Sequence, residues 1–193
     1  MSTEQMEHFY NNIEGWFSYD YIYKHVVDTA EDGELFVEVG SFKGRSSAFM
    51  AVEIANSGKK IRFDCVDTWQ GAIEHQQGGA AEVEEVVNGT LYDVFLKNIE
   101  PVKDYINPVR MTSLEAAAQY EDDSIDFIMI DGSHETEDVI ADIRAFLPKM
   151  KNGGIMAGDD VWAGTGPAIA AEQELRKYGV QYPGTHFYCV INK

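Results

Sequence analysis

The sequence predicts an α/β fold built around a mostly parallel sheet, on three observations. Short apolar runs alternate with helix-length segments along the 193 residues, as crossover connections require. Two of these runs, at 125–130 and 155–158, are followed by acidic residues. The run at 35–39 is followed by a glycine-containing turn. In open α/β sheets the carboxyl ends of parallel strands line the ligand crevice, so these features should meet at one edge.

Each element is predicted from its own pattern. Gly58 should end the helix over 45–56, because glycine is common just past helix ends. Pro167 suits the first turn of a helix, and Pro108 weakens the strand over 105–111. The elements expected in chain order are a helical segment over 4–30, a strand over 35–39, the helix over 45–56, a strand over 61–67, a helix over 92–99, the weak strand, a short helix from Ser113, a strand over 125–131, a helix over 135–147, a strand over 155–159, a helix over 167–178 and an antiparallel hairpin over 180–191.

Two segments interrupt the alternation of strands and helices. Residues 68–104 are much longer than a crossover needs, and long insertions in compact domains are usually lids or binding loops. Residues 1–33 form an N-terminal helical segment rich in aromatic side chains. This segment either covers the active site or forms the face of a homodimer, unless its aromatic side chains simply pack into the core. Without repeats or low-complexity tracts, the chain is expected to fold as a single domain over 1–193.

The charge balance argues against several classes of partner. The chain has 33 acidic and 15 basic residues, a formal net charge of −18, whereas nucleic acids and anionic membranes are bound by basic patches. We therefore expect no nucleic acid and no membrane partner. Cys65 and Cys189 lie in apolar runs and suggest no disulfide framework. The chain shows no signal-peptide pattern and no apolar stretch of membrane-spanning length, so a cytoplasmic location is expected.

Acidic residues follow two neighbouring predicted strands. Asp131 follows the run at 125–130, and Asp159 and Asp160 follow the run at 155–158. Three carboxylates at one edge repel one another unless a cation or a proton intervenes, and oxygen ligands of this kind bind hard divalent ions such as Mg²⁺. In the alternative reading, one acid caps the following helix and the others are solvated.

The first strand–turn–helix unit, over 38–47, has the features of a ligand-binding turn. Its glycines, Gly40 and Gly44, allow a tight turn and close approach of the backbone, and a helix N-terminus offers free N–H groups. It is not a GxGxxG fingerprint. Asp67, at the end of the second strand, can accept two ribose hydroxyls or cap the following loop. Trp69 either stacks on an adenine ring or covers the edge of the sheet.

The chain resembles the class I S-adenosylmethionine-dependent methyltransferases, in particular the metal-dependent O-methyltransferase branch. That branch includes catechol O-methyltransferase and the macrocin-type sugar O-methyltransferases. The resemblance implies a Rossmann-like, doubly wound, seven-stranded sheet with an antiparallel C-terminal edge strand, abbreviated here because the chain after residue 178 is short. The residues that carry it are 37–46 (VEVGSFKGRS), 66–69 (VDTW), 112–117 (TSLEAA), 130–134 (IDGSH) and 158–160 (GDD).

The resemblance also implies which residues bind the cofactor. Asp67 would hold the ribose hydroxyls with Trp69 beside it, Ser113 would touch the adenine, and Asp131 would lie near the sulfonium. The methionine part and the turn around it would be held by Glu38, Gly40, Ser41, Phe42 and Ser46.

The same resemblance implies the metal and catalytic residues. Asp131, Asp159 and Asp160 would bind Mg²⁺ or another divalent cation, leaving positions open for two substrate oxygens. His134 corresponds to the histidine suggested as general base in the sugar-modifying members, and Asp131 would serve catalysis beside it. The catechol branch is expected to have a lysine in that role, but residues 133–136 (SHET) contain none. His134 could instead belong only to the first turn of the helix that follows.

The function expected from these residues is Mg²⁺-dependent O-methylation by S-adenosylmethionine. The acceptor would be a small hydroxylated molecule, methylated on a vicinal hydroxyl of a sugar or polyhydroxylated natural product. Three alternatives remain open: a non-catalytic S-adenosylmethionine-binding module, a methyltransferase that needs no metal, and a nicotinamide-dependent oxidoreductase, against which the missing GxGxxG fingerprint counts.

Overall fold

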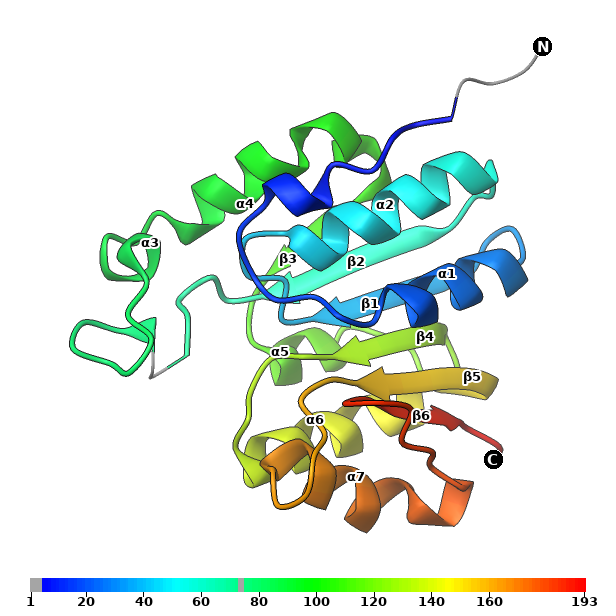
Figure 1. Cartoon of the computed structure of the whole chain (residues 1–193). Helices are drawn as coiled ribbons and strands as arrows, with labels where there is room; N and C mark the ends of the chain where they lie inside the picture. The colour runs from blue at the N-terminus through cyan, green and yellow to red at the C-terminus, as the bar shows by residue number, and fades with distance from the viewer. Residues whose placement is uncertain (1–4, 73–74) are drawn as a thin grey trace.

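A single mixed sheet forms the centre of the molecule in the computed structural model, which describes residues 5–72 and 75–193. The strand order is β3-β2-β1-β4-β5-β6, with β1 to β5 parallel and β6 antiparallel to β5 (Figure 1). The expected Rossmann-like, doubly wound fold with an antiparallel edge strand is confirmed. Its described part has six strands, so the abbreviated form is the correct one. The strands are β1 (Leu35–Val39), β2 (Arg62–Asp67), β3 (Asn107–Arg110), β4 (Ile125–Ile130), β5 (Met150–Gly158) and β6 (Phe187–Val190).

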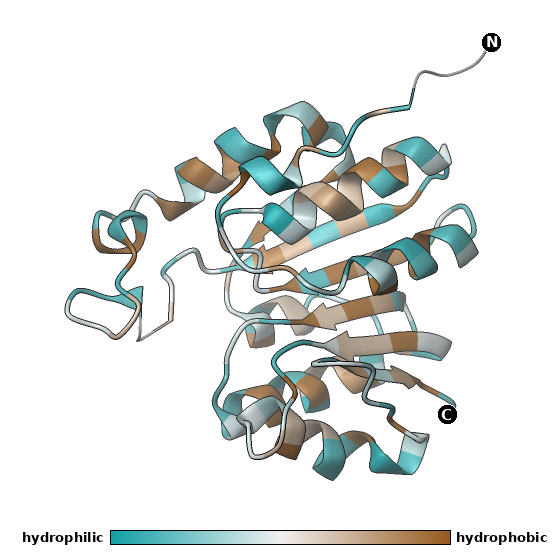
Figure 2. Ribbon diagram, in the orientation of Figure 1, coloured by the Kyte–Doolittle hydropathy of each residue, from teal (hydrophilic) through white to brown (hydrophobic). Residues whose placement is uncertain are grey.

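The helices cover both faces of the sheet. One hydrophobic cluster joins α1, α2 and α4 to the sheet through residues such as Phe36, and the other joins α5, α6 and α7 through residues such as Val37. Because consecutive strand residues point to opposite faces, each strand feeds both cores. Figure 2 shows largely hydrophobic central strands between helices of alternating character. The helices are α1 (Asp20–Thr29), α2 (Arg45–Ser57), α3 (Glu84–Val87), α4 (Leu91–Ile99), α5 (Ser113–Ala117), α6 (Thr136–Phe146) and α7 (Gly166–Leu175).

Local sequence signals explain where several helices begin. The Thr112 side chain accepts a hydrogen bond from the Glu115 N–H, and the Glu115 carboxylate accepts one from the Thr112 N–H, so α5 starts with a capping box. At α7, the Thr165 side chain accepts a hydrogen bond from the Ala168 N–H, and Pro167 lies in the first turn as expected. Among the described residues, no helix combines the length and the apolar character needed to cross a membrane.

The N-terminal segment is less helical than its sequence suggests. Residue 4 of the helix expected over 4–30 lies outside the described residues. Over 5–30 the helix is confined to α1, preceded by a short 3-10 turn, η1 (Tyr10–Asn12). Arg45 on α2 donates hydrogen bonds to the carbonyls of Ile13 and Gly15. These carbonyls are therefore not available to a helix, and the segment between η1 and α1 runs extended past the strand ends (Figure 1).

Two other boundaries differ from those expected. β5 begins at Met150 rather than at 155, with a register irregularity opposite β4; its Asn152-Gly153-Gly154 sequence resembles a turn and hides the strand. In the C-terminal hairpin, the first strand is reduced to one bridge between Gln181 and Tyr188.

The helix expected in the 68–104 insertion is confirmed as α4, preceded by α3 and followed by the 3-10 segment η3 (Glu100–Tyr105). Residues 73–74 of that insertion lie outside the described residues.

Candidate functional site

The carboxyl ends of four neighbouring strands, β2, β1, β4 and β5, are aligned by hydrogen bonds that continue just beyond the strands. Gly40 N–H donates to Val66 O at 2.9 Å, Asp131 N–H to Val39 O at 2.8 Å, and Asp159 N–H to Ile130 O at 3.2 Å. The chain leaves β1 toward β2 and β3 but leaves β4 toward β5, so the topological switch point lies between β1 and β4. This is where open α/β sheets bind ligands.

Gly40 lets two backbones meet at that switch point. Its φ is +92°, and a Cβ at this position would lie 2.0 Å from the carbonyl oxygen of Asp131. No other residue fits there without moving β1 away from β4. The turn after β1 is therefore in direct contact with the strand end that carries Asp131.

Asp67 holds the turn after β1 in place. Its Oδ2 accepts the N–H groups of Ser41 and Phe42, both at 2.9 Å, and its Oδ1 accepts the N–H of Trp69 at 2.7 Å. Phe42 and Trp69 have φ values of +46° and +52°, which are unusual for large side chains. Burial raises the pKa of Asp67, and the backbone donors oppose that rise. A carboxylate accepts about four hydrogen bonds, so Asp67 retains capacity for about one ribose hydroxyl.

The residues expected around the methionine part of the cofactor are brought together, but not all of them reach the surface of the site. Glu38 is fully buried, where its carboxylate accepts hydrogen bonds from the hydroxyls of Tyr23 and Ser47. Burial also raises the pKa of Glu38. Ser46 lies buried in the first turn of α2. Among the described residues, Ser41 Oγ is one of two buried side-chain nitrogen or oxygen atoms without a hydrogen-bond partner. A ligand hydrogen bond would satisfy it.

Trp69 packs into the core beside the turn. It is 2% exposed, its ring contacts Tyr92 and Phe95, and its indole N–H donates to Phe42 O at 2.9 Å. This environment favours the role of covering the sheet edge over that of stacking on adenine.

A pocket of about 730 Å³ opens next to Asp67, between the ends of β2 and β3. Ser113, expected to touch adenine, donates its hydroxyl hydrogen to buried Asp142 on α6 at 2.5 Å. Its side chain is therefore engaged with α6, beside this pocket. The residues that line the pocket include Thr68 and Gln70 after β2, Arg110 and Met111 at the end of β3, and Thr112 and Glu115 at the start of α5.

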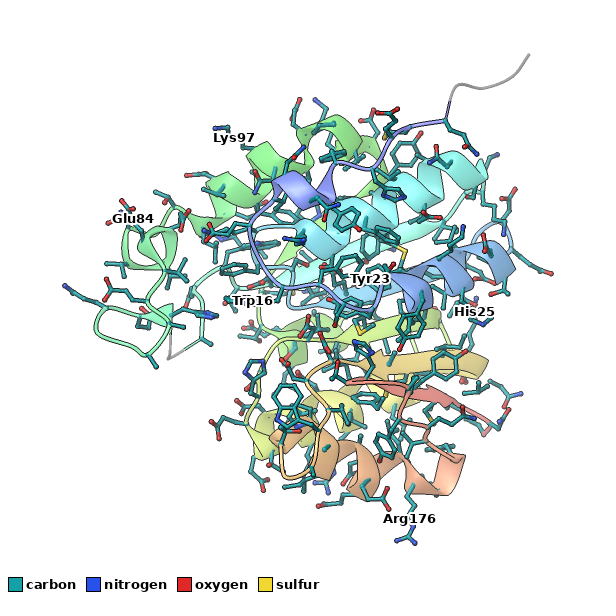
Figure 3. All side chains as sticks on the ribbon, in the orientation of Figure 1. Trp16, Tyr23, His25, Glu84, Lys97 and Arg176 are labelled. Atoms are coloured by element: carbon teal, nitrogen blue, oxygen red, sulfur yellow. The ribbon has the colours of Figure 1, made fainter. Side chains whose placement is uncertain are left out.

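Two segments meet over the turn after β1. The buried Lys43 ammonium lies 2.7 Å from Glu14 of the N-terminal segment and 2.8 Å from Glu85 of the 68–104 insertion. The Trp16 ring stacks on His75 of the insertion, with 6.4 Å between ring centroids. Trp16 is 73% exposed and lies on the carboxyl-end side of the strands (Figure 3).

On the other side of the switch point, three side chains converge into a possible ligand set. One ligand atom from each of Asp131, His134 and Asp160 lies within 4.8 Å of the others. His134 Nε2 is 2.6 Å from Asp160 Oδ2. Asp160 has a φ of +59°, a conformation that costs energy and often marks functional sites. Burial, followed by the charge of Asp159, raises the pKa of Asp131 well above its usual range.

Asp159 lies at the same edge of the sheet, and we call Asp131, Asp159 and Asp160 together the acidic rim. The carboxylate of Asp159, however, contacts a different partner. Its Oδ1 accepts the N–H of Asp160 at 2.7 Å and lies 3.2 Å from Nε2 of buried His186. Of the three aspartates expected to bind metal, the structure therefore groups Asp131 and Asp160 with His134. Asp159 lies beside them, paired with a histidine.

Several rim residues could not have been found from the sequence. Tyr19 is fully buried and donates its hydroxyl hydrogen to Asp131 Oδ2 at 2.8 Å. Ser18 and Tyr21 contact His186, which precedes β6. These residues lie 112 to 168 positions from their partners. Only their aromatic or polar character is visible locally, and core packing explains that equally well.

The residues at this edge fit the groups that the sequence implies. For a nucleoside-containing cofactor, the structure offers the Gly40 turn, the partnerless Ser41 Oγ and the pocket beside Asp67. For a divalent cation, it offers carboxylates whose mutual repulsion a positive charge would relieve, with an imidazole beside them.

A comparison with family models identifies the family. A family model described as a methyltransferase domain matches residues 37–161. An uncharacterized protein of Sinorhizobium fredii is 31% identical over 114 residues, which are 59% of this chain and 12% of that protein. The chain thus spans only a small part of that relative's length.

Solved structures share the fold at low sequence identity. The O-methyltransferase NovP has a TM-score of 0.67 at 14% identity, covering 91% of this chain and 80% of its own. A Corynebacterium glutamicum protein has a TM-score of 0.62 at 10% identity, covering 95% and 85%. A Methanococcus maripaludis protein described as an S-adenosylmethionine-dependent methyltransferase has a TM-score of 0.56 at 16% identity, covering 91% of this chain and 84% of its own. The family match spans more than half of the chain and runs from within β1 to just beyond Asp160, so the chain belongs to the family of methyltransferase domains.

Proposed function

We propose that the protein is a metal-dependent O-methyltransferase that transfers the methyl group of S-adenosylmethionine to a hydroxyl of a small polyhydroxylated molecule. The observation that carries the proposal is the convergence of Asp131, His134 and Asp160 at the carboxyl end of β4 and β5, beside the Gly40 turn. A methyltransferase that needs no metal does not require two carboxylates and an imidazole so close together.

The cofactor would lie along the strand ends from β3 to β4. Its adenosine would occupy the pocket beside Asp67, which is lined from β2, β3 and α5. Its methionine part would cross the Gly40 turn toward Asp131, where Ser41 Oγ lacks a partner among the described residues. The N-terminal segment and the insertion, joined through Lys43, would cover it.

The acceptor would bind at the acidic rim. A bound divalent cation would supply Lewis acidity and a template for two adjacent hydroxyl oxygens. His134 would take the proton of the reacting hydroxyl, and its contact with Asp160 would orient the ring and stabilise the resulting imidazolium. In the transfer, the sulfur–methyl bond breaks as the oxygen–methyl bond forms, and S-adenosylhomocysteine leaves as the neutral thioether.

The acceptor class rests on the absence of a lysine after Asp131 and on the likeness of fold to NovP, which is an O-methyltransferase. A sugar or another vicinal diol presents two neighbouring oxygens to one cation, which suits a rim with few protein ligands.

The first test is calorimetric titration with S-adenosylhomocysteine and, separately, with Mg²⁺ and Mn²⁺. We expect S-adenosylhomocysteine to bind with micromolar affinity both with metal and in EDTA, and metal to bind the unmodified protein. Asp160→Asn should abolish metal binding while leaving S-adenosylhomocysteine affinity within a few fold.

Asp123→Asn is the matched control for that variant. Asp123 also has a positive φ, +55°, but lies away from the rim and pairs with Lys193. Metal binding that survives Asp160→Asn would remove the metal from the proposal. If no S-adenosylhomocysteine binds under either condition, the assignment of the cofactor site is wrong.

A further inference from the structure

His186 is a buried imidazole with polar partners at both ring nitrogens, at the edge of the acidic rim. It is 3% exposed. Its Nε2 lies 3.2 Å from Asp159 Oδ1 and 3.0 Å from Ser18 Oγ. Its Nδ1 lies 2.9 Å from the Tyr21 hydroxyl and 3.1 Å from Pro183 O. The ring is thus held in one orientation, with Nε2 directed at the carboxylate.

The partners that fix this ring come from the opposite end of the chain. Ser18 and Tyr21 flank Tyr19, whose hydroxyl reaches Asp131 and whose ring packs edge-on against His186 at 5.8 Å. Residues 18–21 therefore contact one rim aspartate directly and the next through His186. We call Ser18, Tyr19 and Tyr21 the N-terminal clamp.

Because His186 is buried, it is not placed to act as a catalytic base. A base must meet the acceptor hydroxyl directly or through one water, and this ring is covered. His134, whose side chain is 58% exposed, is the accessible histidine of the rim. A histidine buried among polar partners can be purely structural, but here the contacts end on a carboxylate of the candidate metal site.

We propose that His186 is a positioning residue that fixes the orientation of Asp159 for a divalent cation and is itself held by the N-terminal clamp. The proposal rests on the function proposed above. Asp159 Oδ1 is engaged by His186 and by the Asp160 N–H, which leaves Oδ2 as the oxygen that would bind a cation. Residues that orient metal ligands in this way typically contribute 10- to 100-fold in metal affinity.

The test compares Mn²⁺ affinity and S-adenosylhomocysteine affinity in four variants by calorimetry. His186→Leu should weaken Mn²⁺ binding by about 10- to 100-fold. His186→Gln should restore most of that loss, because an amide N–H can donate to the same carboxylate. Tyr21→Phe removes one hydroxyl from a side chain that is 46% exposed, so it should cause a smaller loss without disturbing the core. S-adenosylhomocysteine affinity should remain within a few fold throughout.

His25→Leu is the matched control. His25 lies in the middle of α1, away from the carboxyl ends of the strands (Figure 3), with its ring centroid 6.5 Å from that of Tyr188, and its loss should leave Mn²⁺ affinity unchanged. Unaltered Mn²⁺ binding in both His186→Leu and Tyr21→Phe would overturn the positioning role. If His186→Gln binds as weakly as His186→Leu, the ring acts through packing and the proposal is wrong. If the unmodified protein binds no Mn²⁺ but binds S-adenosylhomocysteine, the metal centre itself is wrong, and the positioning role falls with it.

Discussion

On the β1–β2 side of the strand-end edge, Asp67 accepts three backbone N–H groups. On the β4–β5 side, Asp131 accepts the hydroxyl of Tyr19, and His186, the partner of Asp159, contacts Ser18, so both depend on the distant N-terminal segment. The partners of Asp67 are at most 26 residues away, whereas Tyr19 is 112 residues from Asp131. The first side is therefore preformed by local backbone geometry. The second side depends on long-range packing and retains mutual repulsion that a cation would relieve.

The largest expected effect breaks the contact between the two sides. Gly40→Ala would place a Cβ 2.0 Å from Asp131 O at a φ of +92°, so we expect failure to fold or a loss of at least about 3 kcal/mol in the free energy of unfolding. Gly33→Ala is the control, because Gly33 has the same φ with nothing within 4 Å, and should cost about 1–2 kcal/mol. Urea denaturation measures both; equal losses would mean that strain alone, not the contact, matters.

The second-largest expected effect tests whether His134, on the β4–β5 side, is the general base. His134→Ala should slow the chemical step by about 10²- to 10⁴-fold, as expected for the loss of a general base, with Mn²⁺ affinity nearly unchanged. Single-turnover rates with a diol acceptor and calorimetry give the two quantities. A rate within twofold of the parent would make His134 structural, and a large loss of Mn²⁺ affinity would make it a metal ligand.

A third prediction concerns a buried acid with a side-chain partner outside the rim. Burial raises the pKa of Asp142 to about 6, although Ser113 donates to it. The folded state then binds more protons than the unfolded state between the two pKa values, so stability falls as pH rises through that window. From about pH 4 to pH 6 Asp142 should contribute a drop on the order of 3 kcal/mol to the free energy of unfolding, and Asp142→Asn should reduce the total drop by that amount. Urea denaturation at several pH values measures both proteins, and an identical pH dependence of the free energy of unfolding in the two would exclude this contribution of Asp142.

The smallest effect tests the preformed side. Asp67→Asn leaves one side-chain oxygen for three backbone donors, so the turn should lose about 1–3 kcal/mol of stability. The affinity for S-adenosylhomocysteine should fall as the turn loosens. Asp123→Asn again serves as the control for an exposed aspartate. Unchanged affinity in Asp67→Asn would show that the turn keeps its shape without this carboxylate.

The same contrast explains what the sequence could predict. The Gly40 turn, Asp67 and the acidic strand ends follow local patterns, and the structure places them along one edge as expected. The extended path before α1, the contact between Ser18 and His186 and the burial of Trp69 depend on packing between remote segments. No local pattern distinguishes Tyr19, which reaches Asp131, from the other aromatic residues of the N-terminal segment.

The contact between Ser18 and His186 spans 168 residues of sequence, which has a consequence for folding. A contact that closes so long a loop cannot form until the sheet between its ends is in place, because the entropic cost of closure must be offset by other contacts. The acidic rim should then be completed late in folding and be the first part to open on partial unfolding. Methyl transfer should accordingly be lost at a lower urea concentration than the helical signal of the protein.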